Sequence, residues 1–173
     1  MQRFTLGDIN ADGEEAFVEA LGHLFEHSPW VARKGYASRP FATLGALHEA
    51  LCGAMRSATR DEQLALVRAH PDLAGRLALS GGLTASSAGE QASAGLDQLT
   101  PSEAAEIERL NSAYLGKFGF PFVICARLND KSAILAAMRA RALNSPDAEL
   151  STALGEIAKI AWLRLKDAVA DTH

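Results

Sequence analysis

Apolar residues recur along most of this chain at intervals of three and four, the spacing of an amphipathic α-helix. One such stripe consists of Leu44, Leu47, Leu51 and Met55. No region alternates cleanly between apolar and polar residues, as a half-buried strand would, and β-branched residues are scarce. The pattern predicts an all-α fold of about eight to nine helices with no significant sheet, in a single domain over residues 1–173.

Capping residues mark where these helices begin and end. The first helix is expected over about residues 12–25, after a short lead-in at residues 5–10. Later starts are indicated by Ser, Thr or Asp, often followed by Pro or, three residues on, by Glu. These predicted caps are Ser28, Thr43, Thr59, Ser87, Thr100, the pair Asn129-Asp130, and Ser145. Gly35 and Gly119 are expected to end helices.

His70 lies at a predicted break between two helices. A residue that precedes proline is pushed out of the helical region, so the helix that begins after Thr59 should end at His70. Pro71 suits the first turn of a new helix, expected to reach Leu79, because its missing N–H would have no partner there. An imidazole fixed at such a corner can face a cavity and transfer protons, and it can equally be structural.

Residues 80–91 allow two compatible interpretations. Glycines and small polar residues predict a mobile loop over residues 80–86, followed by a helix from Ser87 toward Leu96. Ser87 and Glu90 have the spacing of a capping box. Alternatively, Ser87, Glu90 and Gln91 offer a hydroxyl, a carboxylate and an amide to a ligand at a helix start, whose N–H groups attract anions.

Residues 120–126 read Phe-Pro-Phe-Val-Ile-Cys-Ala, a continuous apolar run without a helical period. Such a run predicts a buried segment, and core packing is its default interpretation. Extended backbone in this segment would have N–H and C=O groups without an intrahelical partner. Buried groups of this kind must be satisfied, and a polar ligand is one way to do so.

Composition narrows the possible classes of function. The formal net charge is -4 with the charges interspersed, which argues against a nucleic-acid surface. Two cysteines, Cys52 and Cys125, cannot make a disulfide framework, and no apolar run approaches the length of a membrane helix. A soluble, cytoplasmic protein is therefore expected.

The histidines outside residue 70 give little support to a metal site. His23 and His27 lie four residues apart, but no third ligand of matching geometry follows them. Two histidines near the C-terminus of a helix, favoured by its dipole, are the simpler interpretation. His48 has no evident partner, and it is assigned no role. No metal is predicted.

Three segments taken together resemble the OHCU (2-oxo-4-hydroxy-4-carboxy-5-ureidoimidazoline) decarboxylases of urate degradation. They are Ala-His-Pro-Asp-Leu-Ala-Gly at residues 69–75, Ser-x-x-Glu-Gln at residues 87–91, and Phe-Gly-Phe-Pro-Phe-Val-Ile-Cys-Ala-Arg at residues 118–127. Shorter similarities lie at residues 28–30, 39–41 and 157–165. The resemblance spans almost the whole chain, in order and without a large insertion.

This resemblance implies an all-α homodimer that decarboxylates the product of hydroxyisourate hydrolysis to (S)-allantoin without a cofactor. His70 would be the catalytic acid and Glu90 its partner. Arg164 would reach the substrate carboxylate or a neighbouring oxygen, although an arginine in the last turns of a helix is ordinarily solvated. The residues implied to hold the substrate are Pro71, Ser87, Gln91, Phe122, Val123, Ile124, Cys125, Ala126 and Arg164.

Two other functions fit part of the pattern. A ureide hydrolase could use the same pocket, but it would need an activated water, usually activated by a metal. A non-enzymatic helical interaction module would not need a pre-proline histidine, a Glu at a helix start and an irregular apolar run together. Decarboxylation is therefore the preferred interpretation.

Overall fold

The chain folds into two compact units. The structure, a computed structural model, describes residues 3–75 and 79–171. Unit 1 comprises Met1–Ala69 with Ala158–His173, and unit 2 comprises His70–Ile157. Within the described residues there are nine α-helices, and the only strands form one two-stranded sheet, which confirms the predicted all-α class. The prediction of one domain stays a prediction.

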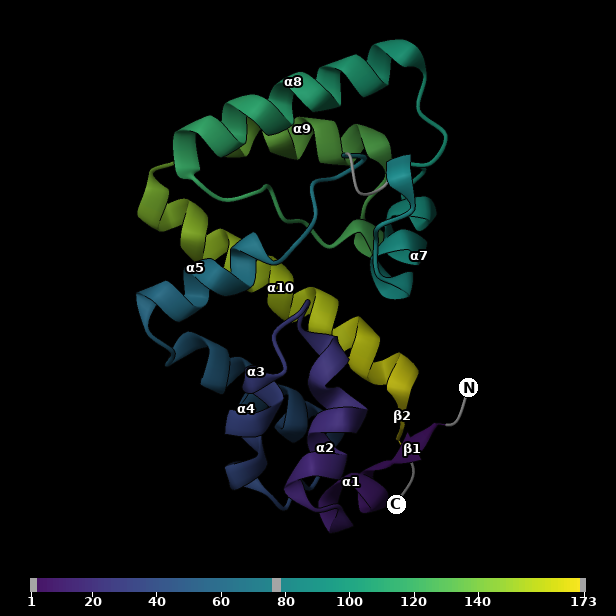
Figure 1. Ribbon diagram of the computed structural model, residues 1–173, viewed down its shortest axis with the longest axis vertical. Helices are drawn as coiled ribbons and strands as arrows, with labels where there is room; N and C mark the ends of the chain where they lie inside the picture. Colours follow the sequence, from purple (N-terminus) through teal and green to yellow (C-terminus); the bar gives the residue numbers. More distant parts are fainter. Residues whose placement is uncertain (1–2, 76–78, 172–173) are drawn as a thin grey trace. The chain divides into compact units, whose positions relative to one another are not determined.

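Unit 1 contains most of the N-terminal half of the chain (Figure 1). Its elements are β1 (Phe4–Thr5), α1 (Leu6–Ala11), α2 (Glu14–Leu21), η1 (Gly22–Leu24), α3 (Trp30–Gly35), η2 (Tyr36–Ser38), α4 (Leu44–Arg56), α5 (Arg60–Arg68) and β2 (Val169–Ala170). The strands β1 and β2 pair in parallel, with Phe4 opposite Val169. This short sheet joins the two ends of the described chain.

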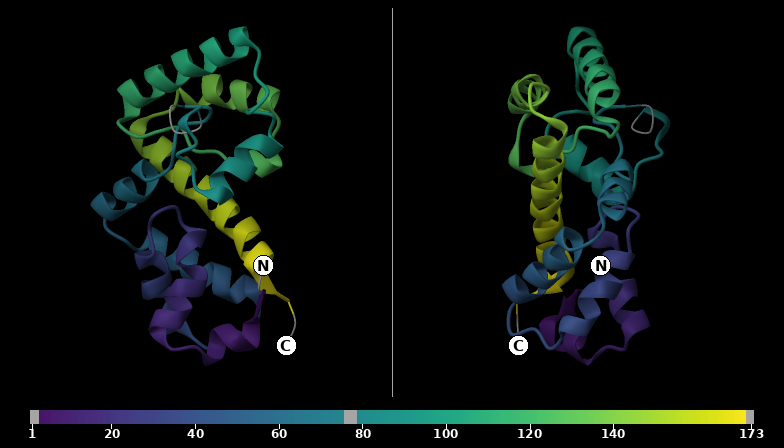
Figure 2. Two further views of the ribbon diagram at one scale, coloured as in Figure 1. Left: turned by 45° about the vertical axis from the view of Figure 1, so that its right-hand side comes forward. Right: turned by 90° about the vertical axis from the view of Figure 1, so that its left-hand side faces the viewer.

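Unit 2 contains four named helical elements of its own. They are α7 (Ala85–Ser93), α8 (Pro101–Phe118), η3 (Ala126–Leu128) and α9 (Lys131–Arg141). Helices α8 and α9 pack side by side, as the views in Figures 1 and 2 show. The last helix, α10 (Pro146–Ala168), contributes residues to both units.

The start of the chain contains one more helix than expected, α1, in the segment expected to be a lead-in. Thr5, expected in a lead-in, instead caps α1: its hydroxyl accepts the Asp8 N–H at 3.1 Å, and the Asp8 carboxylate accepts the Thr5 N–H at 2.8 Å. Asp12 is extended, so α1 ends and α2 begins after Gly13. The helix expected over about residues 12–25 is present as α2, which η1 continues to Leu24. The lead-in expected at residues 5–10 was wrong, because the Thr5–Asp8 capping box starts a separate helix there.

The core of unit 1 forms where α3 packs on α4. The predicted stripe of Leu44, Leu47, Leu51 and Met55 is buried, which confirms it. Gly35 ends α3 as predicted, and a Cβ there would lie 2.7 Å from the Leu51 Cδ2 atom. Glycine therefore lets the two helices approach closely.

Other predicted caps vary in outcome. Thr43, Thr100 and Asp130 each accept a backbone N–H of the first turn, as expected. Ser28 does not cap α3, because its hydroxyl donates to the Glu26 carbonyl at 2.9 Å. His48, which lacked an evident partner, lies 2.8 Å by its Nε2 atom from the Ala158 carbonyl oxygen.

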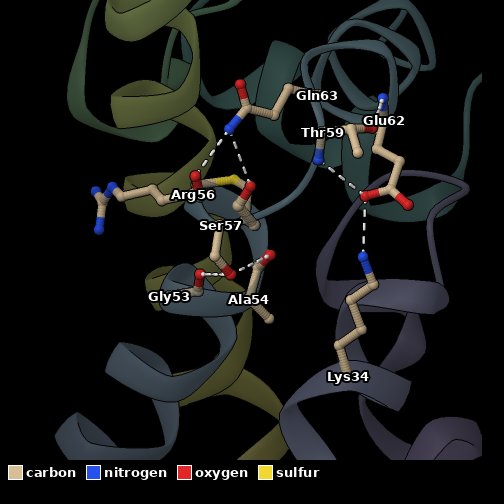
Figure 3. Close-up of polar contacts among 9 residues, drawn as sticks. Lys34, Gly53, Ala54, Arg56, Ser57, Thr59, Glu62 and Gln63 are labelled. Carbon is tan, nitrogen blue, oxygen red and sulfur yellow. Dashed lines mark hydrogen bonds and ion pairs between the residues drawn. The ribbon is translucent and has the colours of Figure 1, made fainter.

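Side chains hold the turn between α4 and α5 (Figure 3). The predicted Thr59–Glu62 capping box is present, with both hydrogen bonds at 3.2 Å. The Gln63 amide donates to the Met55 and Arg56 carbonyls at the end of α4, and Lys34 pairs with Glu62 at 2.9 Å. The orientation of α5, which leads to His70, is thereby tied to α4.

No α-helix in the described part of the chain is long and apolar enough to span a membrane.

Thr59→Ala should lower the free energy of unfolding by about 1 kcal/mol, because the first turn of α5 loses its cap. Lys34→Ala is the matched control: it removes an exposed ion pair to the same carboxylate and a contact of the ammonium with the Trp30 ring, and it should change stability less than the loss of the cap. Urea denaturation of both variants measures the difference. If Lys34→Ala costs as much as Thr59→Ala, the capping box is not what stabilises this turn.

Candidate active site

His70 lies immediately after a helix end. Helix α5 ends at Arg68 with Ala69 as its C-cap, so the predicted break before Pro71 is confirmed. The histidine is 8% exposed and is the first residue of unit 2. Its imidazole is thus fixed in a buried position by the backbone geometry that precedes a proline.

The short helix expected after Pro71 does not begin there. Residues 71–75 are turns and irregular backbone, residues 76–78 of the expected helix lie outside the described residues, and Leu79 at its expected end is helical, with its N–H donating to the Gly75 carbonyl at 3.1 Å. Ala74 has a φ of 50°, in the left-handed region, which a right-handed helix cannot include. At Gly75, a Cβ would lie 2.7 Å from the Asp72 Cβ, so this close turn requires glycine.

The Gln91 side chain holds this turn. Its Oε1 atom accepts the Ala74 N–H at 2.9 Å, and its Nε2 atom donates to the Asp72 carbonyl at 3.4 Å. From α8, Asn111 Nδ2 donates to the Leu73 carbonyl at 2.9 Å. Side-chain amides therefore satisfy backbone groups that a helix would have paired internally.

Helix α7 begins earlier than predicted. Its N-cap is Thr84, whose hydroxyl accepts the Ser87 N–H at 3.2 Å, so the expected capping box of Ser87 and Glu90 is wrong. Thr84 and Ser87 both have a hydroxyl that can accept a hydrogen bond at the start of a helix. Glu90, three residues after Ser87, favoured Ser87 as the start. Ser87 consequently lies in the first turn of α7, and Glu90 lies in the second.

Three predicted site residues share one face of α7. Glu90 and Gln91 follow Ser87 by three and four residues, the spacing of neighbours on a helix surface. Ser87 and Gln91 are buried, and Glu90 is partly buried. Because Gln91 contacts the turn after His70, this face is directed toward the segment that carries the histidine.

The apolar run at residues 120–126 is buried and irregular, as predicted. Arg141 Nη1 donates to the Val123 carbonyl at 2.7 Å. The Cys125 carbonyl accepts from Asn129 Nδ2 at 2.9 Å and from the Leu128 N–H at 3.1 Å. The segment leads into η3, which packs against α7, so Ala126 lies on an element that contacts the helix of Ser87 and Glu90.

A buried polar network supports this segment. The Glu149 carboxylate, with no exposed surface, accepts from Tyr114 Oη and Arg141 Nε, each at 2.6 Å. Burial, together with the carboxylate beside it, raises the pKa of the Tyr114 phenol far above its ordinary value, so the hydroxyl stays protonated and donates its hydrogen bond to Glu149. This network was not predicted, because its members come from three separate helices. One feature of the sequence could have indicated it: Arg141 follows Ile134 and Met138 at helical spacing, so a charged residue falls on the buried face of α9.

Arg164 lies in the part of α10 that belongs to unit 1. Unlike an ordinary arginine in the last turns of a helix, it is not solvated. It is 4% exposed, and its Nη1 atom lies 2.9 Å from Glu26 Oε2 and donates to the His23 carbonyl at 3.3 Å. Glu26 is 3% exposed, so the pair is a buried one. Contact of Arg164 with a substrate stays a prediction.

A cavity of about 800 Å³ in unit 2 borders the turn at residues 72–75 on the side of α7 and α8. Asp72, Gln91 and Asn111 line it, together with the leucines 79, 83, 96, 99 and 115. Burial raises the pKa of the Asp72 carboxyl above its ordinary value. Gln91 is therefore the predicted site residue that this cavity shares, whereas His70, Ser87 and Glu90 are not among its lining residues.

A metal site and a disulfide each require particular side chains close together. Within residues 3–75 and 79–171, no three His, Cys, Asp or Glu side chains are grouped to hold a metal ion. Cys52 and Cys125 are buried and are not joined in a disulfide. Burial raises the pKa of the Cys52 thiol, which keeps it protonated near neutral pH.

Unit 2 thus gathers the His70 turn, the Ser87 face of α7 and the end of the apolar run, the three segments that carry the family resemblance. A model of the OHCU decarboxylase family matches residues 10–166 of this chain. The chain belongs to the OHCU decarboxylase family. The match includes residues of both units.

Individual relatives of the family agree with this assignment. The chain is 43% identical to the 2-oxo-4-hydroxy-4-carboxy-5-ureidoimidazoline decarboxylase of Haloferax volcanii, over 96% of this chain and 97% of that protein. It is similar to a crystal structure of (S)-allantoin synthase, with a TM-score of 0.76 and 29% identity over 96% of this chain and 54% of that chain. A crystal structure of OHCU decarboxylase in the presence of (S)-allantoin matches with a TM-score of 0.67 and 25% identity, over 90% of this chain and 97% of that chain.

Gln91→Leu should lower the free energy of unfolding by about 1–3 kcal/mol, because it leaves the Ala74 N–H and the Asp72 carbonyl without their partner. Gln98→Leu is the matched control at an exposed position. Urea denaturation compares the two. Equal stability of the two variants would show that the amide of Gln91 does not hold the turn.

Proposed function

We propose that this protein decarboxylates 2-oxo-4-hydroxy-4-carboxy-5-ureidoimidazoline to (S)-allantoin in urate degradation, with His70 as general acid and Glu90 as its partner. The observation that carries the proposal is the contact of Gln91 with the turn at residues 72–74. It directs the face of α7 that bears Glu90 toward the segment of His70. Membership of the OHCU decarboxylase family supplies the carboxy-lyase reaction.

The reaction needs stabilised negative charge and then a proton. Loss of carbon dioxide leaves an electron pair on a carbon next to the ring imine and carbonyl. Hydrogen-bond donors fixed where this charge develops lower the barrier without reorganising. The backbone of residues 122–126 and the hydroxyl of Ser87 are the proposed donors, and the Pro71 carbonyl and the Gln91 amide complete the substrate contacts.

Protonation on one face then gives a single enantiomer. Imidazole suits this step because its ordinary pKa lies near neutrality. A carboxylate beside it favours the imidazolium, so Glu90 would increase the fraction of His70 that can donate a proton. The burial of His70 limits the directions from which it can reach the carbon.

Three further expectations belong to this proposal. Residues 1–173 act as one catalytic domain, which the family match over residues 10–166 supports. The protein is a homodimer, testable by light scattering as a mass of twice 18.4 kDa. It works in the cytoplasm, a reducing compartment in keeping with the buried thiols of Cys52 and Cys125.

His70→Ala should lower the decarboxylation rate by about 10²–10⁴-fold, the ordinary contribution of a general acid. The variant should remain folded, because the turn after it is held by Gln91 and Asn111. His27→Asn is the control: it removes an exposed imidazole at a positive φ that asparagine tolerates. A folded His70→Ala protein with a rate close to that of His27→Asn would contradict the assigned role.

Circular dichroism tests the activity itself. Freshly made hydroxyisourate and its hydrolase are supplied to the wild-type protein in the presence of a chelator, and the allantoin signal is followed. We expect accelerated formation of one enantiomer. Racemic allantoin at the spontaneous rate would exclude decarboxylase activity, and activity lost with the chelator would favour a metal-dependent hydrolase.

A further inference from the structure

Arg141 joins a buried carboxylate to the backbone of the proposed substrate-binding segment. We propose that Arg141, held by Glu149 and Tyr114, is a positioning residue for decarboxylation: it fixes the peptide unit between Val123 and Ile124. This inference rests on the proposed function, because it takes the backbone of residues 122–126 as a substrate contact. Arg141 itself does not touch the substrate in this proposal.

The guanidinium of Arg141 makes three different contacts at once. Its Nε atom binds Glu149 Oε1 at 2.6 Å, and its Nη1 atom donates to the Val123 carbonyl at 2.7 Å. Its central carbon lies 4.2 Å from the centroid of the Phe122 ring. A planar, forked cation is suited to this combination, whereas an ammonium is a single point of charge.

Glu149 is oriented as firmly as the arginine it binds. Tyr114 Oη donates to its Oε1 atom at 2.6 Å, and Asn144 Nδ2 donates to its Oε2 atom at 3.0 Å. Helices α8, α9 and α10 each contribute one of Tyr114, Arg141 and Glu149. The position of the Val123 carbonyl is therefore tied to three helices and cannot shift independently of them.

Fixing a carbonyl also fixes the N–H of the same peptide unit. A trans peptide is planar, and its C=O and N–H point in opposite directions. With the Val123 carbonyl directed at Arg141, the Ile124 N–H points away from Arg141. The Cys125 carbonyl is held in the same way by Asn129, so the Ala126 N–H points away from Asn129.

These two N–H groups are available to a ligand. Among the described residues, neither the Ile124 N–H nor the Ala126 N–H donates a hydrogen bond to another protein group. Both residues are buried, and a buried donor without a partner is unfavourable unless something satisfies it. The substrate of the proposed reaction carries acceptor oxygens and nitrogens that can do so.

The ion pair of Arg141 and Glu149 is better explained by its effect on the orientation of the Val123 carbonyl than by a gain in stability. Burying two charges is costly, and apolar residues of similar volume often replace such a pair without loss of stability. An apolar residue at 141 could fill the space, but it could not donate to the Val123 carbonyl. What only the charged network provides is the direction of that peptide.

The test compares variants that separate this direction from folding. Arg141→Met with Glu149→Gln removes both charges together, so no unpaired carboxylate remains buried, and the protein should stay folded. Its kcat for decarboxylation should fall by about 10²-fold with KM little changed, because a donor that acts in the transition state is misplaced. Arg139→Met is the matched control, since Arg139 lies on α9 like Arg141 but forms an exposed ion pair with Glu106 of α8.

Arg141→Lys provides a second variant that keeps the charge beside Glu149. It should fold and retain more activity than the double variant but less than Arg139→Met. Thermal unfolding of each variant gives the folded fraction at the assay temperature, so kcat is expressed per folded molecule.

Each outcome decides a different point. If the wild-type protein does not decarboxylate, both the proposed function and this inference are overturned. If it is active and both Arg141 variants equal Arg139→Met in kcat per folded molecule, only the positioning role is overturned. If the double variant does not fold, the kcat of Arg141→Lys per folded molecule decides alone. A kcat below that of Arg139→Met supports the positioning role, and a kcat equal to it overturns that role.

Discussion

Buried backbone outside regular helices must find hydrogen-bond partners, and unit 2 depends on this constraint. Two of its irregular segments, at residues 71–75 and 120–126, are held by side chains rather than by neighbouring backbone alone. Gln91 and Asn111 hold the first segment, and Arg141 and Asn129 hold the second. The positions of both segments are consequently set by the helices that carry these side chains.

This arrangement suits a reaction that depends on fixed donors. Helical backbone uses its own N–H groups internally, whereas an irregular segment anchored through its carbonyls can present N–H groups to a ligand. In this protein the anchoring is done by amides and by one guanidinium. Gln91 places the turn after His70 beside α7, and η3 packs against the same helix. A decarboxylation without a metal or organic cofactor would draw its charge stabilisation from such groups.

Local signals predicted much of the fold and the break at His70. Thr59, Thr100 and Gly119 act as capping rules require, and the helix before Pro71 ends where proline sterics predict.

The start of α7 was misplaced because Thr84 and Ser87 both satisfy the capping rule locally. The helix expected after Pro71 does not begin there, because residues 71–75 form a turn in which Gln91, distant in sequence, accepts the Ala74 N–H; Leu79, at its expected end, and Ser80 are helical. Arg141 and Glu149 were missed for the same reason: their partners come from three helices, and no local pattern records that. The substrate itself came from family resemblance, since spacing cannot specify it.

A crystal structure of the wild-type protein with (S)-allantoin tests most directly whether the anchored backbone of unit 2 is the site of the reaction. We predict allantoin within hydrogen-bond distance of the Ile124 or Ala126 N–H, with the His70 imidazole facing the carbon that is protonated. Allantoin bound elsewhere, for example in the leucine-lined cavity beside Asn111, with the backbone of residues 122–126 making no contact to it, would contradict this.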